Sequence, residues 1–126
     1  MHAAEGERRL AIQVILLPKD TNAHGSVFGG VILSHIDLAA AVEARRHTRR
    51  ILVTVAMHEV KFHKPVYVGD LVSFYTRLVR IGTTSITVKV EVEARRKEDD
   101  SVVQVTEAEV VYVAVDKDYK KVPVRE

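Results

Sequence analysis

The sequence predicts an α+β domain in which a long antiparallel sheet wraps around one central helix. From Val31 to Val42 the only polar residues are Ser34, His35 and Asp37, and a helix that is apolar on nearly every side is a buried helix. Four β-branched segments follow it, separated by short turns. One helix followed by a run of hairpins is an α+β pattern. The simplest packing therefore wraps the sheet around the helix.

The expected elements follow one another without a repeat or a low-complexity segment. Alternating apolar residues predict a first strand over residues 10–16, which ends at Pro18 and is followed by a polar loop over 19–26. The buried helix is expected from about Phe28 to His47. Further strands are expected over residues 51–63, 71–81, 86–94 and 102–115, with a charged turn over 97–101. The domain is expected to span residues 8–116, with terminal tails over 1–7 and 117–126, the latter loosely held.

Composition limits the classes of protein that need to be considered. With 126 residues and 47% hydrophobic content, the chain is expected to form one domain with a substantial core. It contains no cysteine, which excludes disulfides, thiolate metal sites and a cysteine nucleophile. No apolar run is long enough to span a membrane, and the first residues do not form a signal peptide, so we expect a cytoplasmic protein without membrane contact. A net charge of +2 permits an anionic ligand without requiring nucleic acid.

The most informative residue is Asp37, a carboxylate within the apolar helix. Burying a charge costs several kcal/mol unless it is paired, hydrogen-bonded or near water. Just before this helix, Gly29 and Gly30 could leave the helix N-terminus bare, with N–H groups free to bind an oxygen anion. A buried acid and an oxyanion-binding turn are the two halves of a hydrolytic site.

Three separated segments resemble one enzyme family. Residues 18–30 (PKDTNAHGSVFGG) followed by Asp37, then 62–70 (FHKPVYVGD) and 82–85 (GTTS), are similar to hot-dog-fold acyl-CoA thioesterases of the cytosolic acyl-CoA hydrolase branch, in particular to their short bacterial single-domain relatives. The resemblance covers roughly residues 8–116. It implies the hot-dog fold, catalytic roles for Asn22 and Asp37, hydrolysis of acyl-CoA to a free acid and CoA, no cofactor, and sites shared between paired chains.

The chemistry of thioester hydrolysis agrees with these residues. The reaction passes through a tetrahedral oxyanion, so the site needs fixed donors and a base or nucleophile beside the carbonyl. The N–H groups of Gly29 or Gly30 and the side chain of Asn22 can donate, while Asp37 can act as general base or as nucleophile. At a rise of 1.5 Å per residue, Gly30 and Asp37 lie on the order of 10 Å apart along one helix. The acid should therefore meet the oxyanion turn of another chain, which predicts a homodimer as the minimal unit and a higher oligomer of dimers.

Other residues are candidates for binding the substrate, acyl-CoA. His24 and Phe28 are expected to line the site, and the family places the pantetheine and nucleotide arm near the turn formed by Gly82, Thr83, Thr84 and Ser85. The phosphates of CoA could bind Arg95, Arg96 and Lys97, which we favour slightly over the cluster at residues 45–50, because Arg matches phosphate oxygens bidentately. No metal site is expected, because His58 and His63 would face opposite sides of a strand.

Each candidate also has a structural interpretation. In that interpretation Asp37 only pairs with a buried partner, Asn22 only forms a turn or caps a helix, and the glycines only permit close packing. The basic runs are then solvated faces or surface ion pairs. At the level of function, the alternatives are an acyl-thioester dehydratase or hydratase, a non-catalytic acyl-CoA-binding hot-dog protein, and a nucleic-acid binder. His35 is too near Asp37 in sequence to form the His–acid pair of a dehydratase, and no nucleic-acid recognition motif is present.

Overall fold

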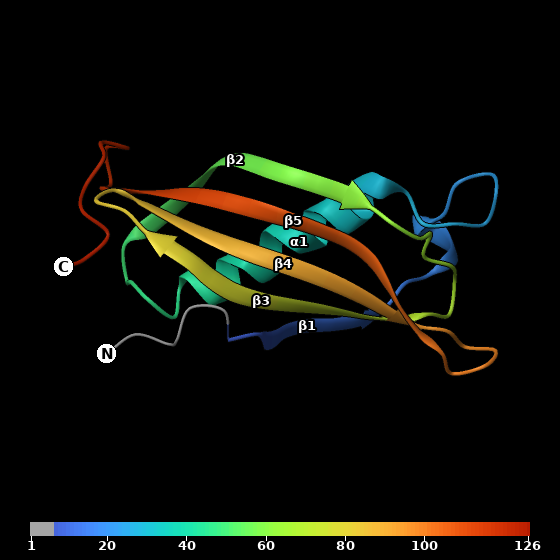
Figure 1. Ribbon diagram of the computed structural model, residues 1–126. Coiled ribbons are helices and arrows are strands. Elements are labelled where there is room, and N and C mark those ends of the chain that lie inside the picture. The colour runs from blue at the N-terminus through green and yellow to red at the C-terminus, as the bar shows by residue number, and fades with distance from the viewer. Residues whose placement is uncertain (1–6) are drawn as a thin grey trace.

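A computed structural model describes residues 7–126, and its architecture confirms the predicted fold class. Five strands form one antiparallel sheet in the order β1-β3-β4-β5-β2, with the single long helix lying across it (Figure 1). The elements are β1 (Arg9–Ile15), a short 3-10 helix η1 (Pro18–Asp20), α1 (Gly29–Ala44), β2 (Ile51–Phe62), β3 (Leu71–Ile81), β4 (Ser85–Arg95) and β5 (Val102–Val115). No helix within residues 7–126 is long and apolar enough to cross a membrane.

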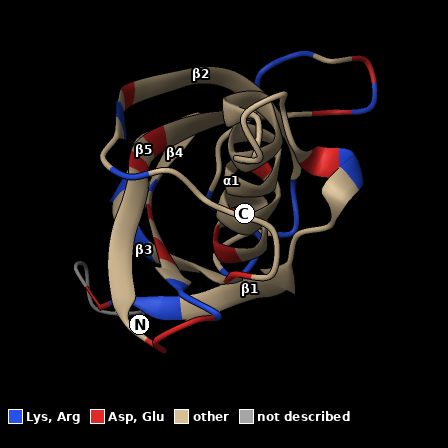
Figure 2. Ribbon diagram, turned by 90° about the vertical axis from the view of Figure 1, so that its right-hand side faces the viewer, with Lys and Arg blue, Asp and Glu red and all other residues tan. Residues whose placement is uncertain are grey.

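The sheet curves around α1 and encloses the core between its inner face and the helix. Figure 2 shows β2 and β1 on opposite sides of the helix, with the other strands forming the wall between them. Strand residues alternate between the two faces, and most buried positions are apolar, as for Phe74, Val90 and Val110, with Thr76 and Thr106 among the exceptions. The helix contributes Ile36 and Ala40 to this core. One continuous apolar core thus fixes the helix on the sheet.

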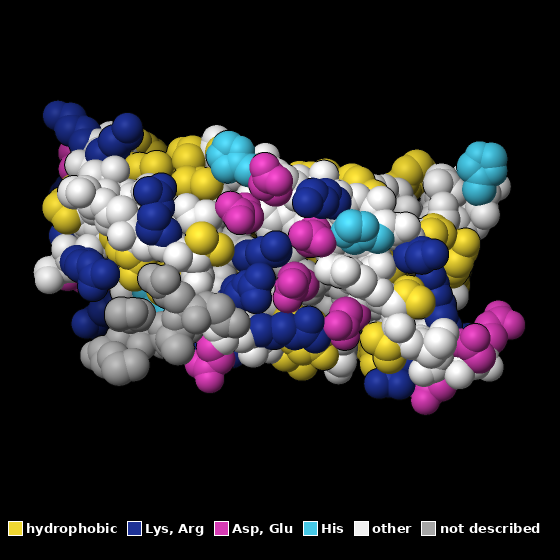
Figure 3. Space-filling model, viewed as in Figure 1, with side chains coloured by type: hydrophobic (Ala, Val, Ile, Leu, Met, Phe, Trp, Pro, Cys, Tyr) yellow, Lys and Arg dark blue, Asp and Glu magenta, His cyan; other side chains and the backbone are white. Residues whose placement is uncertain are grey.

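The outer face of the sheet carries mixed charge, as Figure 3 shows. Glu107 lies 3.2 Å from Lys89 and 2.9 Å from His63, and the pKa of its carboxyl is lowered chiefly by the hydrogen bond from His63. Arg8 lies 2.9 Å from Glu93. This division between a charged outer face and an apolar inner face accounts for the clear alternation in the sequence of β4.

The helix differs from its prediction in two respects. It ends at Ala44 rather than at residue 47, because residues 45–47 form a turn. It is also not buried on all sides, because the sheet covers only one side of it. Leu38 and Val42 are 60% and 39% exposed, and together with the exposed Ser34 they form a stripe along the uncovered side. The apolar composition of α1 therefore reflects an exposed apolar surface as well as the core.

The C-terminal segment is held against the domain, so the expectation of a loose tail was wrong. Val124 is completely buried, and its amide donates to the carbonyl of Thr83 at 2.8 Å. Its carbonyl accepts a hydrogen bond of 2.8 Å from the hydroxyl of Thr48. The segment thus joins the turn between β3 and β4 to the loop after α1.

Strand β2 forms one edge of the sheet and is interrupted by two irregularities. Its pairing with β5 shifts register between Thr54 and Ala56 and again between His58 and Lys61. At the second shift Glu59 has a left-handed backbone, with φ of 55°. This conformation is uncommon for a residue with a side chain, and such bulges reverse which side chains face the core.

Candidate active site

The carboxylate of Asp37 is half-buried and held by two hydroxyl groups. Its Oδ1 accepts hydrogen bonds from Thr54 on β2 at 2.9 Å and from Tyr112 on β5 at 2.8 Å. The same Tyr112 hydroxyl lies 2.6 Å from the backbone carbonyl of Asp37. Within residues 7–126 the other carboxylate oxygen, Oδ2, has no hydrogen-bond partner. One oxygen is therefore held by the protein, while the other is available to contact water or a ligand.

Tyr112 is suited to remain a donor to Asp37. Burial and the neighbouring carboxylate raise the pKa of the Tyr112 phenol far above its ordinary value of 10.0. The phenol therefore stays protonated at any pH at which a protein works. Neither Tyr112 nor Thr54 was identified from the sequence; the only signal was a hydroxyl-bearing residue at an inward position of a predicted strand.

His35, the nearest imidazole in sequence, does not share this site. Its Nδ1 lies 2.9 Å from the carbonyl of Val31, and its ring stacks on Phe74 at a centroid distance of 5.6 Å. The ring is thus engaged with the helix backbone and the sheet core. The His–acid pair that a hot-dog dehydratase would need is not formed between His35 and Asp37.

Asn22 organises the loop before α1. Its side-chain oxygen accepts hydrogen bonds from the amides of His24 at 2.8 Å and Ser26 at 3.3 Å, and its Nδ2 donates to the hydroxyl of Ser26 at 3.0 Å. Asn22 is therefore a turn residue, as the structural interpretation expected. An amide nitrogen carries two hydrogens, however, so one donor remains for a ligand.

The N-terminus of α1 presents free donors beside this loop. The helix begins at Gly29 after Phe28, which provides no side-chain cap. Within the described chain, the amides of Gly29 and Gly30 donate to no protein acceptor, whereas the amides of Val31 and Ile32 donate to the carbonyl of Phe28. Both glycines are exposed. The positive end of the helix dipole thus adds to two free N–H groups, an arrangement that favours an oxyanion.

The two halves of the predicted site are separate in one chain. Gly30 begins the helix, and Asp37 lies seven residues further on, which corresponds to about 10 Å of helix axis. His24 and Phe28 are exposed at the same end of the molecule as Gly30. The structure therefore brings Asn22, Phe28 and Gly30 together, but it does not bring Asp37 to them within a single chain.

The turn over 82–85 lies at the other end of β4 from residues 95–97. Ser85 and Arg95 are the first and last residues of β4, which places them roughly 34 Å apart at about 3.4 Å per residue. The turn is internally bonded, since the amide of Gly82 donates to the carbonyl of Ser85 at 2.8 Å. One CoA molecule cannot use both groups of the same chain in a compact site.

The cluster of Arg95, Arg96 and Lys97 is largely occupied by contacts within the domain. Arg96 forms an ion pair with the buried Asp70, and its guanidinium lies 5.0 Å from the centre of the Tyr67 ring. Arg95 lies 3.4 Å from Asp100. Arg95 thus forms a surface ion pair, whereas Arg96 is bound to a buried carboxylate and helps to hold the turn before β3.

The second basic cluster lies beside the turn over 82–85. Arg49 and Arg50 line a hollow of about 440 Å³ after α1. A second hollow of about 470 Å³ is lined by Gly82, Thr83 and Arg125, among others. Arg50 connects the two, because its Nε donates to the carbonyl of Pro123, which lines the second hollow, at 2.9 Å. This end of the molecule therefore combines exposed cations with recessed surface.

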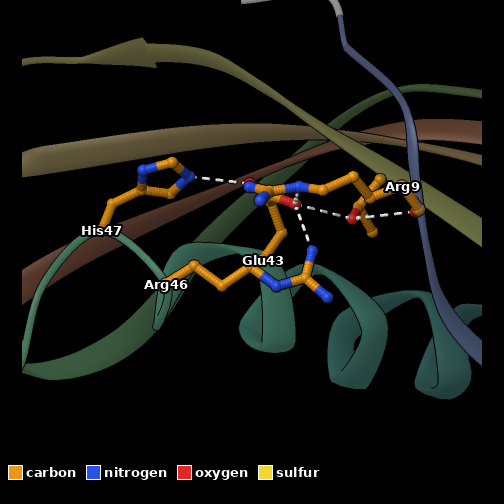
Figure 4. A network of polar contacts seen from close by, with 5 residues as sticks. Arg9, Glu43, Arg46 and His47 are labelled. Atoms are coloured by element: carbon orange, nitrogen blue, oxygen red, sulfur yellow. Dashed lines mark hydrogen bonds and ion pairs between the residues drawn. The ribbon is translucent and has the colours of Figure 1, made fainter. Parts of the chain in front are cut away.

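A second acid in the helix, Glu43, is completely buried and was not identified from the sequence. Figure 4 shows its carboxylate between Arg9, Arg46 and His47. Arg46 lies 2.8 Å and His47 2.7 Å from its oxygens, Arg9 forms a further ion pair, and Thr76 donates at 3.1 Å. Burial alone would raise the pKa of Glu43, but the hydrogen bonds from Arg9, His47 and Thr76 outweigh it and lower the pKa to about 2. With every acceptor occupied, this acid is part of the framework.

Comparison with known proteins identifies the family. The family model described as the thioesterase superfamily matches residues 24–101, which is more than half of the chain. The chain belongs to this superfamily. The acyl-CoA thioester hydrolase YciA of Salmonella typhimurium is 39% identical over 117 residues, covering 90% of this chain and 88% of that protein.

Solved structures of thioesterases have the same fold. A hexameric hot-dog-fold thioesterase of Campylobacter jejuni superposes with a TM-score of 0.86 at 44% identity, covering 91% of this chain and 89% of that one. An acyl-CoA hydrolase of Staphylococcus aureus, solved in complex with butyryl coenzyme A and coenzyme A, superposes with a TM-score of 0.84 at 27% identity, covering 94% of this chain and 71% of that one. This thioesterase chain therefore has the hot-dog fold, as its sequence predicted.

Proposed function

We propose that this thioesterase hydrolyses acyl-CoA to a free carboxylic acid and CoA, with Asp37 as the catalytic carboxylate. The observation that carries the proposal is the carboxylate of Asp37, which is held through one oxygen by Tyr112 and Thr54 while its other oxygen is free. A framework carboxylate such as Glu43 has all its acceptors occupied, and Asp37 does not. The acyl-CoA hydrolases among its relatives support the substrate class.

The reacting groups come from two chains in this proposal. The thioester carbonyl accepts hydrogen bonds from the amides of Gly29 and Gly30 and from the second N–H of Asn22 in one chain. Asp37 of the other chain faces the carbonyl carbon. The apolar stripe at Leu38 and Val42 and the unpaired edge of β2 supply surface for such pairing, because exposed apolar area and free strand edges both favour association. The Campylobacter jejuni relative is a hexamer, which accommodates three such pairs.

Two chemical routes are open to Asp37. As a general base it takes a proton from water, whose oxygen attacks the carbonyl; the tetrahedral oxyanion then collapses, the C–S bond breaks, and the proton passes to the thiolate of CoA. As a nucleophile it displaces the thiolate and forms an anhydride, which water then hydrolyses. Single-turnover hydrolysis in ¹⁸O-labelled water separates them, because only the nucleophilic route can place the label in the Asp37 carboxylate.

The nucleotide arm of CoA is proposed to bind at the end of the molecule that carries Arg49, Arg50 and Arg125. The hollows there adjoin the turn over 82–85, to which the family resemblance assigns the same role. Arg96, by contrast, is committed to Asp70. This proposal reverses the slight preference for residues 95–97 that was based on the sequence. Because CoA is a metabolite of the cell interior, the proposed location of the enzyme is the cytoplasm.

Hydrolysis of an acyl-CoA panel, followed by detection of the free thiol, tests the activity directly. Asp37→Asn conserves volume but removes the base, so we expect turnover to fall by roughly 10²–10⁴ while folding is retained. Glu98→Asn, which changes an exposed carboxylate in the turn after β4, is the control and should leave turnover unchanged. Near-normal turnover of well-folded Asp37→Asn protein would remove Asp37 from the mechanism.

Subunit mixing tests the shared site. Asn22→Asp keeps the acceptors that hold the loop but removes the donor to the oxyanion. When inactive Asn22→Asp and Asp37→Asn proteins are refolded together, hybrid pairs should carry one intact site and recover part of the activity. If exchange of subunits is demonstrated by mass spectrometry and activity does not return, each site belongs to a single chain.

A further inference from the structure

An open cleft of about 270 Å³ lies directly beside the N-terminus of α1. Apolar side chains from both sides of the helix–sheet junction make up most of its lining: Val27, Ile32, Phe62, Pro65 and Val66. His63, Lys64 and the buried Thr106 are the polar residues of the lining. Gly29 also borders it. The cleft therefore begins at one of the two glycines whose amides are free, and it offers mainly hydrocarbon surface to whatever extends from them.

Phe62 faces this cleft because of the bulge in β2. Met57 pairs with the buried Val110 on β5 and therefore faces the core. With uninterrupted alternation Phe62 would face the opposite side, five residues later. The extra residue at the bulge changes this, and Phe62 instead pairs with the buried Thr106. The left-handed backbone of Glu59 accompanies this reversal, and strained backbone of this kind collects at functional sites.

The ring of Phe62 consequently lies against the oxyanion turn. A Cβ atom added to Gly29 would lie only 3.3 Å from the tip of this ring, although the side chain of Phe62 is 55% exposed. Because about half of this large aromatic side chain is exposed, its own burial contributes little to holding it in this position. The ring lines the cleft where the cleft borders Gly29, so we expect its size to limit what can pass from the free amides into the cleft.

We propose that this cleft receives the acyl chain of the substrate and that Phe62 determines the chain length the enzyme accepts. The inference rests on the proposed function. A carbonyl oxygen bound by the amides of Gly29 and Gly30 places the first carbons of its acyl chain next to Gly29, at the opening of the cleft. The apolar lining suits hydrocarbon, whereas the phosphates of CoA are matched by the arginine-rich hollows at the other end of the molecule.

The size of the cleft indicates a short or medium chain. A methylene group needs about as much room as a water molecule, roughly 30 Å³. The cleft of about 270 Å³, which is open to solvent, therefore has room for several such groups. We expect kcat/KM to rise from acetyl-CoA to octanoyl-CoA and to fall for dodecanoyl- and palmitoyl-CoA.

Variants at Phe62 test the inference against the same panel. The measured quantity is the ratio of kcat/KM for dodecanoyl-CoA to that for butyryl-CoA. Phe62→Ala opens the passage and should raise this ratio at least roughly tenfold, the lower end of the discrimination that one methylene produces in a hydrophobic pocket. Phe62→Trp narrows the passage and should lower it. Val60→Ala, on the same strand but outside the cleft, is the matched control and should leave the ratio unchanged.

The outcomes separate the inference from the function on which it rests. An unchanged ratio in Phe62→Ala, with wild-type oligomeric state by light scattering, would overturn the role of Phe62. Equal loss of activity for all chain lengths would also overturn it, because Phe62 would then support assembly rather than selectivity. Failure of the unmodified protein to hydrolyse any member of the panel would instead refute the proposed function, and the inference with it.

Discussion

The buried carboxylate of Glu43 should make the stability of this protein depend on pH in a defined way. Its pKa is lowered from an ordinary 4.5 to about 2 in the folded protein. Each unit corresponds to 1.36 kcal/mol, so the ionised form contributes about 3 kcal/mol to the free energy of unfolding. Because the pKa is lower in the folded state, this contribution is complete above pH 4.5 and is lost as the pH falls from 4.5 towards 2.

Glu43→Gln removes the charge while keeping the shape of the side chain. It leaves the guanidinium groups of Arg9 and Arg46, each 33% exposed, without their carboxylate. We expect the free energy of unfolding at pH 7 to fall by about 3 kcal/mol, because removing one partner of a buried ion pair typically costs about this much. The difference from the unmodified protein should shrink as the pH is lowered below 4.5.

Urea denaturation followed by circular dichroism at several pH values, at fixed protein concentration, measures this difference. Glu98→Gln provides the control, since Glu98 is exposed and belongs to no ion pair within residues 7–126. A Glu43→Gln protein that loses stability equally at pH 7 and at pH 3 would refute the electrostatic reasoning. Such a result would attribute the loss to packing alone.

Three further predictions concern other parts of the molecule. Tyr112→Phe removes a hydrogen bond to the carboxylate of Asp37, so steady-state kinetics should show kcat lowered roughly 10- to 100-fold with little change in KM. An equally large rise in KM would contradict a positioning role for Tyr112. Arg49→Gln with Arg125→Gln should raise KM and make it less dependent on salt, because exposed charge pairs are screened within about 8–10 Å; unchanged salt dependence would place the phosphates elsewhere. Val124→Ala should lower the free energy of unfolding by about 2 kcal/mol in urea denaturation, and a neutral effect would mean that the C-terminal segment is not part of the core.

The sheet was readily predicted from the sequence because its two faces differ so sharply. The bounds expected for β3 and β5 agree with the structure, since both segments are rich in apolar and β-branched residues and turn residues flank them. The end of α1 was not predicted, because the apolar run passes into Arg45 and Arg46 without a helix-stop signal such as glycine. The packed tail was missed because it depends on one apolar residue, Val124.

The candidate site was predicted only in part, because some of its residues are close in sequence and others are far apart. Asn22, Gly30 and Asp37 lie within a short segment, and the rise of a helix sufficed to show that they could not meet in one chain. The partners of Asp37 come from β2 and β5, far along the sequence, and only the pairing of these strands selects Tyr112. Glu43 was overlooked since an acid at the polar end of an apolar run resembles a solvated residue, and its burial depends on Arg9 from β1.

The two edges of the sheet differ in a way that bears on how far the protein can assemble. Within residues 7–126, strand β2 has 12 residues and offers the longer free edge, although two register shifts interrupt its pairing with β5, whereas β1 has only 7 residues and one register shift between Leu10 and Ile12. Strands that join edge to edge around a two-fold axis use the same edge of both chains. If β2 is consumed in this way, only the short, interrupted edges remain at the ends. The joined sheet then ends in two short strands, which offer little length for a further chain to pair with, so growth into a fibre, the usual hazard of an exposed strand, is disfavoured.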